Sequence, residues 1–115
     1  MTPRLFDEGI KDKNNIGVVA VDGNTVIGYG FFSLKEKEVR ALYVLPRYTS
    51  KGAGKLIMAR LEELSREQNI DRLTLQSTIN AVGFYRSLGY REIKTERHPV
   101  SEDISVTCVR MEKTF

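Results

Sequence analysis

The sequence has almost none of the residues that build covalent or metal-bound frameworks. Its 115 residues include a single cysteine, Cys108, and a single histidine, His98. One cysteine excludes an internal disulfide framework, and one cysteine with one histidine excludes a zinc site built from several such ligands. We therefore expect no bound metal and a soluble protein of a reducing compartment, the cytoplasm.

Long apolar runs are also missing. No stretch approaches the roughly 20 apolar residues that a membrane-spanning helix needs. The segment 1–13 has no apolar stretch after its charged residues, so it does not read as a secretory signal. We therefore expect no membrane association.

A strong excess of one charge is lacking as well. The chain has 18 Lys and Arg residues against 15 Asp and Glu residues, a formal net charge of +3. This excess is too small to indicate a nucleic-acid partner, and we expect none. It is compatible with an anionic small ligand if the positive residues cluster.

What the sequence does contain is a series of short runs of β-branched and aromatic residues, interrupted by two stretches with helical periodicity. Turn residues separate them, and Asp22-Gly23-Asn24 is typical of a β-hairpin. We expect strands over 16–21, 25–34, 38–45, 73–77, 90–95 and 104–111, and helices over 55–69 and 80–88.

This order predicts an α/β (α+β) fold in which two helices flank a mixed sheet. No linker or internal repeat divides the chain, so we expect a single domain over residues 1–115. Residues 1–15 carry only a weak helical face and are predicted as a short helix or an arm. We expect a polar loop around His98 and Pro99 between the last two strands.

The segment 42–56 carries the clearest chemical signal. A predicted strand runs into a turn with Gly52 and Gly54, and the turn opens a helix. The first amides of a helix have no internal partners and lie at the positive end of its dipole. Glycines let a phosphate approach those amides, and Arg47, Lys51 and Lys55 add positive charge. The segment predicts an anion site, most simply for a phosphate or pyrophosphate.

Two known phosphate-binding motifs do not match this segment. A Walker-type loop would need glycine at Thr49 and Ser or Thr at Leu56, and the dinucleotide fingerprint would need glycine at Ile57. A helix start with solvated lysines and no ligand remains an alternative, because a short glycine pattern is a weak signal.

A second segment changes the interpretation. Asn80-Ala81, Phe84-Tyr85 and Leu88-Gly89-Tyr90 follow a predicted strand and enter the second helix. Together with the segment 46–56, they resemble the two motifs of the GNAT superfamily of N-acetyltransferases. The preceding hairpin and the last two strands are similar as well, so the resemblance covers about residues 18–115. It implies the mostly antiparallel GNAT sheet and acetyl transfer from acetyl-CoA to a primary amine by direct attack.

The resemblance also implies roles for individual residues. The strand before the loop binds the pantetheine arm, the turn amides bind the pyrophosphate, and the asparagine of the second motif helps to hold the coenzyme. Tyr85 corresponds to the tyrosine that protonates the departing thiolate, which suits a phenol with a pKa of about 10. The implied coenzyme contacts are Leu42, Tyr43, Val44, Thr49, Ser50, Lys51, Gly52, Ala53, Gly54, Lys55 and Asn80.

The chain departs from the family pattern in two places. Thr49 stands where the family usually has Arg or Gln, and Arg47 or Lys51 are candidates to replace that contact. Only about 15 residues precede the first predicted strand of the hairpin, whereas the family normally has a strand and two helices there. A late start, a minimal form and a wall supplied by another subunit all remain open.

Other residues have more than one interpretation. Glu38, at the start of the third strand, is a candidate base or water relay, or a solvated carboxylate paired with Lys37 or Arg40. Asn80 is either a coenzyme contact or an N-cap, and Tyr85 is either the acid or a packing aromatic. His98 is read as an exposed loop residue, and Cys108 as a buried strand residue.

Two functions from different classes therefore remain. The first is an acetyl-CoA-dependent N-acetyltransferase acting on a small-molecule or peptide amine. The second is a non-catalytic module that binds acetyl-CoA or CoA and has a regulatory or assembly role. Exposed sheet edges further suggest a homodimer.

Overall fold

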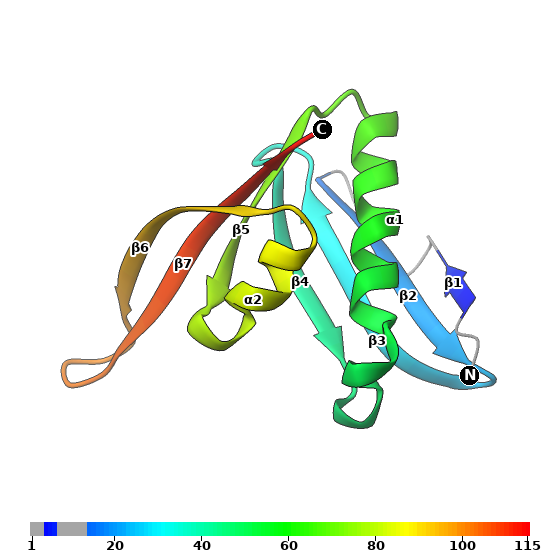
Figure 1. Cartoon of the computed structure of the whole chain (residues 1–115), viewed down its shortest axis with the longest axis horizontal. Helices are drawn as coiled ribbons and strands as arrows, with labels where there is room; N and C mark the ends of the chain where they lie inside the picture. Colours follow the sequence, from blue (N-terminus) through cyan, green and yellow to red (C-terminus); the bar gives the residue numbers. More distant parts are fainter. Residues whose placement is uncertain (1–3, 7–13) are drawn as a thin grey trace. The chain divides into compact units, whose positions relative to one another are not determined.

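The computed structural model describes residues 4–6 and 14–115, in two units, Met1–Asp71 and Arg72–Phe115. In each unit, antiparallel strands pack with helical segments (Figure 1). The expected mixed fold with mostly antiparallel strands is confirmed. Among the residues described, no helix is long and apolar enough to cross a membrane.

The first unit is a meander of four strands followed by a helix. Adjacent strands pair antiparallel in the order β1-β2-β3-β4. A 3-10 turn, η1, then leads into the long helix α1, which lies along β2, β3 and β4 (Figure 1). The elements are β1 (Arg4–Phe6), β2 (Asn15–Asp22), β3 (Thr25–Ser33), β4 (Glu38–Val44), η1 (Pro46–Lys51) and α1 (Ala53–Glu67).

The start of the chain differs from its prediction. Arg4–Phe6 forms a strand that pairs with Val19–Val21 of β2, so a helix over these residues is wrong. An isolated helix shorter than about 12 residues is marginal, whereas the edge of β2 offers backbone hydrogen bonds. The remaining residues of the expected helix or arm, 1–3 and 7–13, lie outside the described part of the chain.

Turn residues behave as the sequence predicts. Gly23 has a φ of 61° in the β2–β3 hairpin, a conformation that glycine adopts without strain. Asn69 follows Gln68, the C-cap of α1, and has a φ of 62°, so it stops the chain from continuing as a helix.

Glycines in β3 bring α1 close to the sheet. A Cβ atom on Gly28 would lie 2.6 Å from the Tyr43 carbonyl oxygen and 3.2 Å from Ile57 Cδ1. A Cβ atom on Gly30 would lie 2.9 Å from Ile57 Cγ2. Ile57 and Leu61 of α1 are fully buried against this surface. Because Gly28 and Gly30 have no side chains, α1 can pack closely against β3.

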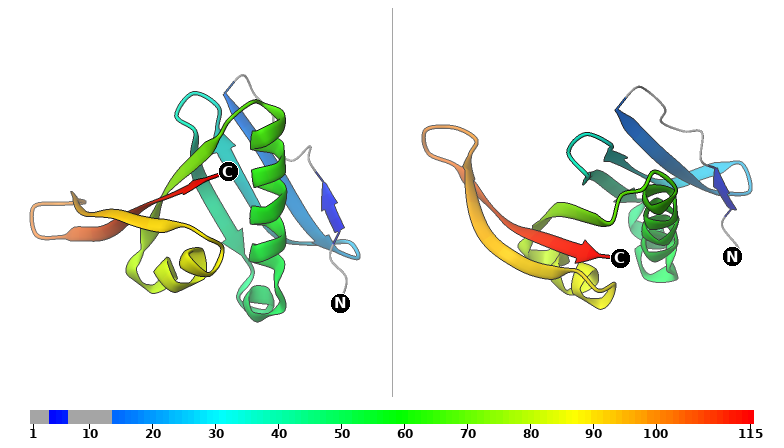
Figure 2. Two further views of the ribbon diagram at one scale, coloured as in Figure 1. Left: turned by 45° about the horizontal axis from the view of Figure 1, so that its top comes forward. Right: turned by 90° about the horizontal axis from the view of Figure 1, so that it is seen from above.

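The second unit contains three antiparallel strands, and the last of them in the sequence lies in the middle, in the order β5-β7-β6 (Figure 2). The short helical segments η2 and α2 connect β5 to β6. The elements are β5 (Arg72–Thr78), η2 (Ile79–Ala81), α2 (Val82–Ser87), β6 (Arg91–Pro99) and β7 (Ser105–Thr114).

Apolar side chains from β5 and β7 fill the core of this unit together with Tyr90, which is almost completely buried. Lys113 Nζ donates a hydrogen bond to the Leu88 carbonyl at 2.8 Å and lies 5.8 Å from the centre of the Tyr90 ring. These contacts link the end of α2 to β7. The buried apolar residues are Leu73, Leu75, Val82, Tyr90, Val109 and Met111.

The prediction of a loop around His98 and Pro99 is wrong. Both residues belong to β6, where they pair with Val106 and Ser105 of β7. Proline is tolerated at the end of an edge strand because its missing amide need not join a ladder. The connection instead runs over residues 100–104, and His98 is half-buried rather than exposed. Cys108 lies in a strand as predicted, but it is half-buried rather than buried.

We predict that Gly28→Ala destabilises the protein. The new methyl group would press on the Tyr43 carbonyl, a backbone atom that cannot rotate away. We expect a loss of about 1–3 kcal/mol, the usual cost of overpacking a core. Urea unfolding measures this as a lower midpoint at a constant slope.

Gly83→Ala is the matched control, because a Cβ atom there would meet nothing within 4 Å. Alanine also favours the helical conformation that Gly83 has in α2. Equal midpoints for the Gly28 and Gly83 variants would contradict the close approach of α1.

Candidate functional site: the turn that opens helix α1

The junction between η1 and α1 brings together the residues of the predicted anion site in the first unit. Thr49, Ser50 and Lys51 form the end of η1, Gly52 is the N-cap of α1, and Ala53–Lys55 is the first turn of the helix. The Leu56 amide is bonded to the Gly52 carbonyl at 3.0 Å. The amides of the three preceding residues therefore come before the first intrahelical bond.

Gly52 shapes this junction. Its φ of 81° lies in the left-handed region, and a Cβ atom there would meet nothing within 4 Å. Glycine is therefore required for backbone conformation, not for space. No side chain caps the start of α1, so an anion is a suitable partner for its first amides.

Positive side chains lie next to these amides. Arg47, Lys51 and Lys55 are all exposed, and the first turn of α1 holds no acidic residue. Ala53 and Gly54 are buried, whereas Gly52 and Lys55 on either side of them are exposed. The arrangement favours a negatively charged ligand.

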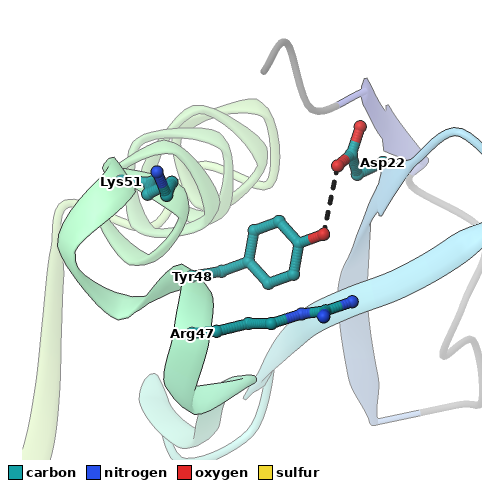
Figure 3. A pocket seen from close by; sticks show the side chains of 4 residues that line it. All are labelled: Asp22, Arg47, Tyr48 and Lys51. Atoms are coloured by element: carbon teal, nitrogen blue, oxygen red, sulfur yellow. Dashed lines mark hydrogen bonds between the residues drawn. The ribbon is translucent and has the colours of Figure 1, made fainter.

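An open pocket of about 480 Å³ lies beside the junction and is lined by Asp22, Arg47, Tyr48 and Lys51. The Tyr48 hydroxyl donates a hydrogen bond to Asp22 Oδ2 at 3.1 Å. Figure 3 shows the Tyr48 ring pointing from η1 toward Asp22, with the Arg47 side chain extended beside it. The Arg47 guanidinium lies 5.4 Å from the centre of that ring, within the range of a cation–π contact.

Thr49 stabilises the turn η1. Its hydroxyl donates a hydrogen bond to the Pro46 carbonyl at 2.9 Å, which closes η1. Arg47 and Lys51 flank the pocket instead. The two residues that the sequence offers in place of a contact at position 49 therefore both line this pocket.

The strand residues expected to hold the pantetheine arm end β4. Leu42, Tyr43 and Val44 pair with Gly30, Tyr29 and Gly28 of β3. The Tyr43 side chain is exposed, and its ring centre lies 5.8 Å from that of Tyr29.

Glu38 lies at the opposite end of β4, which it begins. Its carboxylate is 3.3 Å from the Arg40 guanidinium, and only 13% of its side chain is exposed. The predicted pairing with Arg40 is therefore confirmed, but the carboxylate is mostly buried rather than solvated.

Asn80 and Tyr85 belong to the second unit, in η2 and α2. Asn80 is exposed, and the N-cap of α2 is Ala81, so the N-cap interpretation of Asn80 is wrong. The helix begins two residues after Asn80 because η2 takes up the first turn after β5.

The Tyr85 ring is packed between aromatic neighbours. Its centre lies 5.1 Å from that of Phe84 and 6.1 Å from that of Tyr90, both in edge-to-face geometry. Burial raises the pKa of the Tyr85 phenol above its ordinary value of 10.0. The phenol therefore stays protonated through neutral and mildly alkaline pH, as a proton donor must.

Sequence reasoning missed Asp22 and Tyr48 as parts of this site. Asp22 reads as the first residue of a hairpin turn, and Tyr48 reads as a loop residue beside Arg47. Their hydrogen bond joins positions 26 residues apart. No local pattern encodes such a contact, so only the fold reveals it.

Comparison with known proteins gives one consistent result. The model of the acetyltransferase (GNAT) domain matches residues 1–115. An uncharacterized N-acetyltransferase of Chlorobaculum tepidum is 33% identical over 69 residues, which are 60% of this chain and 43% of that protein. The matched region thus spans less than half of that relative.

Solved structures show the same fold at lower identity. A GCN5-related N-acetyltransferase from Rhodopseudomonas palustris superposes with a TM-score of 0.80 at 20% identity, over 88% of this chain and 62% of that one. A Bacillus anthracis protein solved in complex with acetyl coenzyme A has a TM-score of 0.77 at 18% identity, over 92% and 65%.

We predict that Gly52→Ala destabilises the protein by about 1–2 kcal/mol, because a left-handed φ is strained for an L-residue with a Cβ atom. Gly52→Asn should lose less, since asparagine tolerates this region better. Urea unfolding of the two variants checks the order, and an alanine variant as stable as the asparagine variant would contradict the conformational role of Gly52.

Proposed function

Because this chain belongs to the GNAT acetyltransferase family, we propose that it transfers the acetyl group of acetyl-CoA to a primary amine by direct attack in a ternary complex. The family match over residues 1–115 carries this proposal. The uncapped, glycine-started helix with its cluster of cations supports it. The two units would then act together as one acetyltransferase domain.

The coenzyme site of this proposal lies mainly in the first unit. The amides of Ala53, Gly54 and Lys55 would receive the pyrophosphate, with Gly52 setting their direction. Lys51 and Lys55 would add charge, and the backbone of Leu42–Val44 would hold the pantetheine arm. Thr49 and Ser50 would complete the turn, and Asn80 would contribute from η2.

The reaction needs two proton movements. The amine nitrogen attacks the thioester carbonyl carbon, the carbon–nitrogen bond forms, and the carbon–sulfur bond breaks. Tyr85 would give its proton to the departing thiolate, a role that suits a phenol kept neutral by burial. The proton lost by the amine would pass to Glu38, directly or through water.

The acceptor belongs to the class that GNAT enzymes use, small-molecule or peptide amines. We further propose that the protein works in the cytoplasm as a homodimer. The strand β6 ends the strand order, and most of its residues are exposed, including Ile93. Such an edge favours association with another chain.

We predict that reversing the charge of Lys51 and Lys55 together weakens acetyl-CoA binding. Replacing both with glutamate puts negative charge beside the amides that would hold the pyrophosphate. We expect at least about a tenfold rise in Kd at low salt and a smaller effect at high salt, where exposed charges are screened. Isothermal titration with acetyl-CoA and CoA measures this.

The control variant reverses Lys35 and Lys37, which lie in the β3–β4 turn and change the net charge by the same amount. It should bind acetyl-CoA as the wild type does. If both double variants lose affinity equally, or if the folded wild type binds neither ligand, the proposed coenzyme site is refuted.

We predict that Tyr85→Phe lowers kcat by about a hundredfold or more, the usual contribution of a positioned general acid. The Kd for acetyl-CoA should stay unchanged, because the ring keeps its packing against Phe84 and Tyr90. Initial rates with a panel of amines, measured by thiol release, test this. Coenzyme binding without turnover of any amine would instead support the non-catalytic CoA-binding module.

A further inference from the structure

The pocket beside η1 contains an acidic residue among cations. Asp22, the last residue of β2, lines the same space as Arg47 and Lys51. Its Oδ2 atom accepts the hydrogen bond from the Tyr48 hydroxyl at 3.1 Å (Figure 3). A carboxylate is an unexpected neighbour for a site that attracts anions, so it calls for a physical explanation.

The hydrogen bond between Tyr48 and Asp22 restrains the position of η1. Within η1, the Tyr48 amide is bonded to the Leu45 carbonyl at 2.8 Å and the Thr49 hydroxyl to the Pro46 carbonyl at 2.9 Å. Both bonds join residues of the same turn. Besides the bond from the Leu45 amide to the Ile27 carbonyl of β3 at 2.8 Å, the Tyr48–Asp22 bond attaches the turn to the β2–β3 hairpin. It therefore holds in place the segment that leads directly into Gly52 and the first amides of α1.

The charge of Asp22 has the opposite consequence. A carboxylate near Arg47 and Lys51 offsets part of their positive potential, which lowers the attraction for an anion. Acetyl-CoA and the product CoA carry the same pyrophosphate. Whatever tightens the binding of one tightens the other, and product release limits the rate of many enzymes.

We propose that Asp22 is a positioning residue that sets the affinity of the site for CoA through two opposed effects. Its hydrogen bond to Tyr48 fixes the turn and favours binding. Its negative charge limits binding, so that CoA leaves after transfer. This inference rests on the proposed function, because it takes the turn before α1 as the pyrophosphate site.

Two substitutions separate the two effects. Asp22→Asn removes the charge but keeps a side-chain oxygen that accepts the Tyr48 hydrogen bond. Tyr48→Phe removes the hydrogen bond but keeps the Asp22 charge and the aromatic ring beside Arg47. Tyr29→Phe is the matched control, because it removes a phenol hydroxyl elsewhere in the first unit.

The experiment is isothermal titration of the full chain with CoA at about 0.05 M and about 0.5 M NaCl, which bracket weak and strong screening. Asp22 is half-buried, so for Asp22→Asn we expect a Kd about two to five times lower at low salt and a smaller decrease at high salt, where the exposed part of the charge is screened. For Tyr48→Phe we expect a Kd about three to ten times higher at both salt concentrations, as for the loss of one hydrogen bond. Tyr29→Phe should bind as the wild type does.

Steady-state kinetics add an independent readout. With any amine that the wild type acetylates, Asp22→Asn should lower the KM for acetyl-CoA and lower kcat, because CoA leaves more slowly. Tyr48→Phe should raise KM. A purely structural role of Asp22 would not tighten binding, and thermal melting confirms that each variant is folded.

Two results would overturn the inference. One is a change of Kd in the same direction for Asp22→Asn and Tyr48→Phe. The other is no change for either variant while the wild type binds CoA. If the folded wild type does not bind CoA, the proposed function fails and this inference fails with it.

Discussion

The close packing of α1 on β3 is the constraint on which the rest of the first unit depends. Gly28 and Gly30 leave no side chain between the strand and Ile57, so the helix rests almost on the backbone of the sheet. Because Ile57 and Leu61 fix the middle of α1 against the sheet, they also fix the position of its first turn. Gly52 completes the arrangement with a left-handed conformation, which lets η1 enter the helix with its amides uncapped. The position of the proposed anion site therefore depends on core packing.

The turn of the β2–β3 hairpin also contributes a residue to the proposed site. Its turn residue Gly23 closes the connection, and Asp22 beside it reaches the tyrosine of η1. The same hairpin therefore supplies the glycines that admit α1 and the carboxylate that holds the turn before α1. In the second unit, Tyr85 is positioned by aromatic packing against Tyr90. The Lys113 ammonium group lies over the Tyr90 ring.

Most of the fold follows from local signals. The hairpin turn at Gly23, the helix end at Asn69 and the periodicity of α1 each depend on neighbouring residues, and each was predictable. The strand at Arg4–Phe6 and the inclusion of His98 in β6 were not, because pairing with β2 and with β7 decides them and the residue types of the two segments do not. The same holds at the site. Glycines and lysines in one segment indicate an anion site, whereas the Asp22–Tyr48 contact exists only once two separate segments have folded together.

The order of strands in the second unit has a consequence for synthesis of the protein. The strand β7 lies between β5 and β6, although it follows both of them in the sequence. On the ribosome, β5 and β6 therefore emerge without the neighbour that both of them pair with, and they wait until Ser105–Thr114 has left the exit tunnel. The first unit has no such delay, because each of its strands pairs with the one before it. Unpaired strands are the species most prone to aggregate in a nascent chain. Slow translation over residues 79–104 would lengthen their exposure, so the yield of folded protein should depend more on codon usage there than in the first unit.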